Sequence, residues 1–156
     1  MKVRKIGWCL AIVLLAAPVA SWGQVPALLP GRWEVYELGF LAEAVVPDSI
    51  RERLNDPQVA DLNLAIQRGE AQLVVEFRAN GTYQFTITQA GEQTRLEKGD
   101  YTLINNEISA RSAAPDGSSF HNQRLIKLTK RTLVLAFPAG SRLPGVMEEI
   151  EYRRQK

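Results

Sequence analysis

From residue 31 onward, apolar and polar residues alternate with a period of two in several short segments. The alternation is clearest over residues 72–78 and 82–88, and the dipeptide Asn80-Gly81 lies between these two segments. Successive side chains on a β-strand point to opposite faces, so this period indicates strands with one buried face. Asn-Gly between two such segments is a strong signal for a β-hairpin. The sequence therefore predicts an antiparallel strand pair here.

Six further segments carry a strand signal, and short turns or loops separate them. Gly99, inside one of them, is expected to mark a bend or β-bulge. Ile150 and Tyr152 in the last segment are expected to face inward. About eight short antiparallel strands joined by tight turns are typical of a β-barrel or a sandwich. The six segments cover approximately residues 32–38, 94–104, around 108, 122–128, 133–137 and 146–154.

Between the first two strands, approximately residues 47–69 have a helical pattern instead. Asp56-Pro57 supplies an N-cap residue followed by proline at the first helical position. We expect two short helices, which would either cover one end of a barrel as a lid or brace it, and the sequence leaves both alternatives open. The apolar residues that follow at helical spacing are Val59, Leu62 and Ile66.

The first 23 residues have the order of a cleavable secretory signal. Three basic residues precede the apolar run Ile6–Ala17, and small residues follow up to Gly23. A run of about 12 apolar residues is too short to span a bilayer of roughly 30 Å. We expect cleavage after Gly23 and a periplasmic or secreted protein, with an uncleaved anchor as the alternative. Residues 24–30 would then form a linker, and residues 31–156 one domain.

Removing this leader changes the charge and the cysteine content of the chain. Its only cysteine is Cys9, so no disulfide is expected after processing. Three of the 19 Lys and Arg residues lie in the leader. The remaining 16 and the 17 Asp and Glu residues give the processed chain a net charge of −1. On net charge alone, we expect neither a nucleic acid nor an anionic membrane surface as partner.

The sequence offers no set of residues that a catalytic mechanism requires. His121 is the only histidine, and no nucleophile or orienting carboxylate accompanies it. It is expected at the surface or at a strand edge. Glu149 and Glu151 alternate with the inward residues of the last strand, which favours a solvated outer face over a metal site. We therefore predict a non-catalytic protein with no cofactor and no metal.

Several short motifs, taken in order, resemble the bacterial lipocalin-like domains of the calycin superfamily. They are Gly31-Arg32-Trp33, residues 77–83, 99–103 and 132–135, and Tyr152-Arg153-Arg154. The resemblance implies a single antiparallel up-and-down β-barrel of about eight strands, with the helical insertion between strands one and two. It also implies that Trp33 packs against Arg154, or Arg153 if the register differs by one, and closes one end of the barrel.

In this superfamily the barrel holds a small hydrophobic or amphipathic ligand. The helical insertion resembles the lid of the intracellular fatty-acid-binding branch, but the Arg-x-Tyr of that branch is not matched, because the order here is Tyr152-Arg153-Arg154. An interior filled by side chains is the alternative, and it would suit a protein-interaction or envelope-assembly module. Arg124 shares the strand parity of Ile126 and Leu128, so it is predicted inside, where it would bind the acidic group of a ligand. An internal ion pair or a position at the strand end is the alternative. The other predicted ligand-binding residues are Leu73, Val75, Phe77, Tyr83, Phe85, Ile87, Tyr101, Leu103, Leu133, Leu135 and Phe137.

Overall fold

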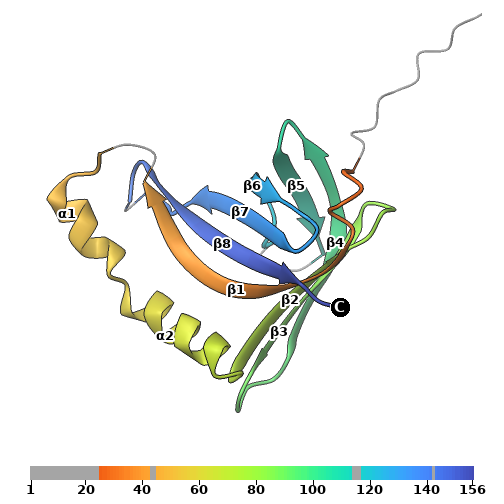
Figure 1. The fold of residues 1–156 in the computed structure, drawn as a ribbon, viewed down its shortest axis with the longest axis horizontal. Helices are drawn as coiled ribbons and strands as arrows, with labels where there is room; N and C mark the ends of the chain where they lie inside the picture. Colours follow the sequence, from red (N-terminus) through yellow and green to blue (C-terminus); the bar gives the residue numbers. More distant parts are fainter. Residues whose placement is uncertain (1–24, 43–44, 114–116, 142) are drawn as a thin grey trace, which may run out of the picture.

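Eight antiparallel strands form a closed barrel in the computed structural model, which describes residues 25–42, 45–113, 117–141 and 143–156 (Figure 1). The predicted leader, residues 1–23, lies outside the described residues. Each strand pairs with the next along the chain, and β8 pairs with β1 to close the ring. The strands are β1 (Gly31–Ala42), β2 (Ala71–Phe77), β3 (Thr82–Gln89), β4 (Arg95–Ile104), β5 (Glu107–Ser112), β6 (Gln123–Leu128), β7 (Thr132–Pro138) and β8 (Val146–Arg154).

This arrangement confirms the predicted up-and-down barrel and excludes a sandwich. Its tight turns follow from local chemistry: Asn105 and Asn106 adopt φ values of 52° and 63° between β4 and β5. Two residues with positive φ form the type I′ turn whose twist matches the flanking strands, and asparagine tolerates that region better than most residues. In the described part of the chain, no helix is long and apolar enough to cross a bilayer.

The helical insertion is present where it was predicted, between β1 and β2. It consists of α1 (Asp48–Arg51), a 3₁₀ turn (Glu52–Leu54) and α2 (Pro57–Gln67). The Asp56 carboxylate accepts a hydrogen bond from the Gln58 backbone N–H at 2.8 Å, which confirms the predicted N-cap. Pro57 follows at the first helical position, where its missing N–H costs nothing.

Helix α2 lies at a gap in the barrel wall where β1 and β2 separate (Figure 1). The two strands pair only from Gly31↔Phe77 to Glu34↔Val74. Beyond that point the Asn63 side chain takes the place of a neighbouring strand. Its Oδ1 accepts from the Leu38 backbone N–H and its Nδ2 donates to the Leu38 carbonyl, both at 2.8 Å. The helix therefore braces the side of the barrel through this contact.

One end of the barrel, which we call the closed end, is where β1 begins and β8 finishes. Trp33 is fully buried there, and the Arg154 guanidinium carbon lies 4.1 Å from its ring centroid. The Trp33 indole N–H donates to the Leu29 carbonyl at 2.8 Å, and Leu29 is itself buried in the core. The predicted Trp33–Arg154 pair is confirmed. The segment at residues 25–30 is thus packed against the barrel rather than a free connection.

Two glycines are required by close approach. At Gly31, with a φ of +142°, a Cβ would lie 2.0 Å from Nη1 of Arg154, so the glycine of the Gly-x-Trp motif makes room for the guanidinium. Of the bend or bulge predicted at Gly99, the bulge is wrong, because pairing with β3 and β5 runs through this residue without a shift. Instead, a Cβ at Gly99 would lie 1.8 Å from the Arg111 carbonyl oxygen and 2.9 Å from the Tyr83 ring.

Candidate functional site

The barrel interior contains nearly all of the residues that were predicted to bind a ligand. Three of them are partly buried: Leu73, Ile87 and Phe137. Alternation along each strand places these and the buried members on one face, as the sequence pattern predicted. The buried members are Val75, Phe77, Tyr83, Phe85, Tyr101, Leu103, Leu133 and Leu135.

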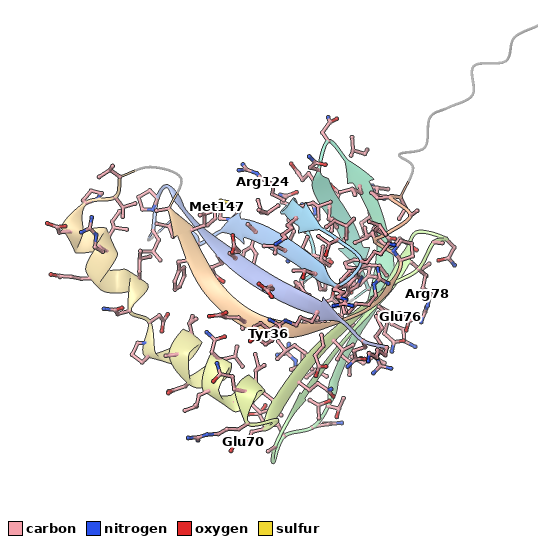
Figure 2. All side chains as sticks on the ribbon, viewed as in Figure 1. Tyr36, Glu70, Glu76, Arg78, Arg124 and Met147 are labelled. Carbon is pink, nitrogen blue, oxygen red and sulfur yellow. The ribbon has the colours of Figure 1, made fainter. Side chains whose placement is uncertain are left out.

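Arg124 is the exception, and its predicted inward position is wrong. Its side chain is exposed and extends away from the barrel wall (Figure 2). The pairing of β6 with β7 shifts between Leu125 and Lys127, so one extra residue reverses the strand's inside–outside parity. Leu125 faces inward before this bulge, and so does Gln123, which is buried. The prediction assigned Arg124 the same face as Leu128, and this fails because the bulge lies between the two residues.

Phe120, in the connection between β5 and β6, fills the middle of the barrel and was missed by the sequence analysis. It is 1% exposed, and its ring centroid lies 5.6 Å from that of Phe77, 5.5 Å from Tyr83 and 5.1 Å from Phe85. All three contacts are edge-to-face or near it, the geometry that aromatic rings favour. A single aromatic residue in a loop has no periodicity, so no pattern could have placed it inside.

A cluster of hydrogen bonds around Glu97 anchors this loop to β4. The Glu97 carboxylate accepts from the Tyr83 hydroxyl, from the Ser119 hydroxyl at 2.6 Å, and from the Ser118 hydroxyl at 3.2 Å. Burial alone raises the pKa of Glu97, but the hydrogen bonds from Ser119, Tyr83 and Ser118 outweigh it and lower the pKa overall. Burial, with the bond to Glu97, raises the pKa of Tyr83 to about 12. The cluster holds the carboxylate ionised and the phenol protonated.

Beside this cluster, a pocket of about 180 Å³ opens toward the end of the barrel where β1 leads into the helices, which we call the helical end. The register pairs Phe85 with Glu97 and Ile87 with Arg95, so all four share the inner face. They meet at the rim of the aromatic core, where the strands extend past Phe120. The remaining lining residues are Leu96, Gly117, Ser118 and Ser119.

Arg95 and the ionised Glu97 are the two charged residues of this pocket, and no hydrogen bond or ion pair joins them. The Arg95 side chain is exposed at the mouth, and neither a hydrogen bond nor an ion pair joins it to the described part of the chain. Glu97, one inward position further along β4, is engaged by its own hydrogen-bond donors. An apolar wall of Phe85 and Ile87 beside a guanidinium suits a small molecule with an apolar part and an anionic group.

The remaining chemistry-bearing residues do not converge. His121 is exposed, as predicted. Within the described ranges, no three His, Cys, Asp or Glu side chains come close enough together to hold a metal ion. Glu148 is on the inward face of β8, opposite Phe40 and Phe137, and burial together with the charge of Asp56 raises its pKa. The Trp33–Arg154 pair is at the other end of the barrel and is structural.

An eight-stranded up-and-down barrel with one end closed by a Trp–Arg pair is a lipocalin-like fold. No protein-family model matches the chain, and no curated protein matches its sequence. Among solved structures it is similar to a lipocalin-like protein from Bacteroides uniformis, with 13% identity over 81% of this chain and 98% of that one, and a TM-score of 0.49. It is also similar to an uncharacterized protein from Bacteroides eggerthii, with 14% identity over 81% of this chain and 99% of that one, and a TM-score of 0.46. The fold assignment rests on the barrel's own topology.

Proposed function

We propose that the protein is an exported, non-catalytic binding protein that holds a small amphipathic anion at the helical end of its barrel. The observation that carries the proposal is the pocket in which Phe85 and Ile87 form an apolar wall beside Arg95. Burying apolar ligand surface contributes about 25 cal/mol per Å², before ordering costs. The guanidinium would supply a charge-assisted hydrogen bond to a carboxylate or sulfonate.

The size of the pocket limits the ligand. Typical small-molecule sites enclose about 300–1,000 Å³, whereas this one offers about 180 Å³. Phe120 and its aromatic neighbours occupy the space that a deeper cavity would need. The site therefore suits a short-chain molecule, or the head of a longer one whose tail leaves through the mouth.

The test uses sodium octanoate as the probe and two-dimensional NMR of the exported protein. We expect saturable shifts at Phe85, Ile87 and Arg95, and weaker binding in Arg95→Gln. Arg111→Gln is the matched control, because Arg111 is an exposed cation on β5 outside the pocket. Ile87→Trp should fill the pocket and abolish the shifts. Octanol separates the two contributions, since it keeps the tail and lacks the charge.

Native mass spectrometry of protein purified from its own cells without detergent complements the titration. A reproducible adduct that Ile87→Trp removes would identify the natural ligand class. No shift with octanoate and a bare mass in every preparation would overturn the proposal.

That negative outcome would favour the alternative, an interaction module with a solid barrel. The observation behind this second candidate is the packing of Phe120 against Phe77 and Phe85, which fills the middle of the barrel without any ligand. Apolar side chains exposed at the helical end, Leu41 and Val45, would then be available to a protein partner.

A further inference from the structure

The closed end of the barrel carries a concentration of positive charge that the pocket at the helical end does not use. A cleft of about 530 Å³ lies between the β6–β7 turn and the end of β8, and no acidic residue lines it. We call its cations the basic cluster. They are Lys130, Arg131, Arg153, Arg154 and Lys156, and Gln155 completes the lining.

Two members of the cluster are held in place by the barrel. Arg154 lies over Trp33 and donates to the carbonyls of Lys130 at 3.0 Å and Pro30 at 2.9 Å. The guanidinium of Arg153 covers the Tyr36 ring at 3.3 Å and contacts Glu151 at 3.4 Å. Carbonyl contacts leave the charge of Arg154 in place, so the cluster remains cationic although Arg153 is paired.

The other three cations are exposed, and no acidic residue among the described residues pairs with them. Lys130 and Arg131 form the β6–β7 turn, and Lys156 follows β8. Two carboxylates of other strands, Glu76 and Glu34, have partners of their own. Glu76 pairs with Arg78, which lies at the same end of the barrel (Figure 2). Glu34 accepts hydrogen bonds from the side chains of Gln72 and Gln155.

We propose that the basic cluster is a docking surface for an anionic phospholipid bilayer. The first described residues lie at this same end, since the carbonyls of Leu28 and Pro30 accept hydrogen bonds from the Arg154 guanidinium. The Leu28 side chain is 40% exposed beside the cluster, so an apolar group is available for the headgroup boundary.

This geometry favours a lipid surface over a nucleic acid. Proteins that bind single strands without sequence preference stack bases on free aromatic rings. The exposed ring next to the cluster is Tyr36, and the guanidinium of Arg153 already covers it. Each Lys or Arg close to an anionic membrane is worth about 1 kcal/mol, so several cations on one face suffice for reversible binding without an anchor.

Vesicle flotation with the exported form of the protein tests the proposal, after its mass has defined its N-terminus. We expect the protein to float with vesicles that contain phosphatidylglycerol and not with pure phosphatidylcholine. Added salt should release it, because the Debye length shortens below about 8 Å above physiological ionic strength. Lys130→Glu with Arg131→Glu should weaken flotation at least tenfold, on the order of the loss of two such charges.

The matched control is Arg68→Glu with Lys98→Glu, which changes the net charge equally at exposed positions outside the cluster. It should float like the unaltered protein, and thermal unfolding should show both variants folded. Equal loss in both variants would reduce the effect to overall charge and overturn the proposal. Flotation independent of phosphatidylglycerol would also overturn it. So would release by soluble glycerol phosphate, or binding to duplex DNA in place of vesicles.

Discussion

At the closed end of the barrel, Arg154 contacts Trp33 and donates to the carbonyls of residues 28, 30 and 130. The segment before β1 and the β6–β7 turn are thereby joined to the end of β8. At the helical end, β1 has left β2 and Asn63 of α2 takes the place of a paired strand. The first end is built from buried aromatic and guanidinium contacts, the second from single hydrogen bonds and half-buried side chains. The comparison predicts that the closed end resists local unfolding more than the helical end, where the proposed ligand pocket lies.

The largest expected effect comes from breaking the closed end. Trp33→Ala removes a fully buried indole, and truncations of this kind cost about 3–5 kcal/mol of unfolding free energy. Tyr36→Ala is the matched control, because the Arg153 guanidinium also covers the Tyr36 ring but Tyr36 is 43% exposed. The Tyr36→Ala variant should lose about 1 kcal/mol of unfolding free energy or less. Urea unfolding measures both, and equal losses would contradict the difference in burial.

An intermediate effect is expected at the gap between β1 and β2. Asn63→Ala leaves the Leu38 N–H and carbonyl without their partner, at a cost of about 1–3 kcal/mol. Hydrogen exchange should show the Leu38 amide losing protection, while amides at the closed end keep theirs. Gln67→Ala on the exposed face of the same helix should change stability by less than about 0.5 kcal/mol. Unchanged protection at Leu38 would show that Asn63 does not hold the wall.

The smallest expected effect on stability comes from two carboxylates inside the barrel, Glu97 and Glu148. Their contributions should depend on pH in opposite directions. The lowered pKa of Glu97 means that its ionised form stabilises the fold above the usual glutamate pKa of about 4.3, and that this contribution disappears as the pH falls through the folded pKa. Glu97→Gln should therefore be less stable than the unaltered protein at neutral pH, with the difference closing in acid.

Glu148 should behave in the opposite sense, since burial and Asp56 raise its pKa. Its contribution is retained below the usual glutamate pKa and is lost as the pH rises through the folded value. Glu148→Gln should match or exceed the stability of the unaltered protein at neutral pH. Thermal melts across the acidic range measure both variants, and a common direction of change would refute the assignment.

The strand pattern predicted the number and approximate positions of the strands, because alternation reports burial directly. It left a barrel and a sandwich open, and the resemblance to lipocalin-like domains implied the barrel. The pattern failed at Arg124, where a bulge in β6 reversed the parity. It also predicted a possible bulge at Gly99, where the structure instead shows a close approach of the Arg111 carbonyl and the Tyr83 ring. The apolar wall of the pocket was predictable, because Phe85 and Ile87 follow the alternation of their strand. Arg95 lies at the start of its strand, and a single charged residue at a strand end carries no pattern that marks it as inward.

The net charge does not describe how the cations are distributed over the surface. A net charge of −1 after removal of the leader says nothing about where the cations lie. Folding brings the β6–β7 turn beside the end of β8, which gathers Lys130, Arg131 and Lys156 on one face.

The sequence by itself determined the approximate number of strands and the helical insertion, because these depend on local periodicity and capping. The resemblance to lipocalin-like domains implied the closure of Trp33 by Arg154 or Arg153, and the structure selects Arg154. Only the tertiary structure decided that Phe120 fills the barrel, that α2 braces the gap beside β1, and that a basic cluster forms at the closed end. Each of these depends on segments distant in sequence meeting across the barrel. No local pattern encodes such a meeting, since its free energy comes from contacts that exist only after the ring of strands has closed.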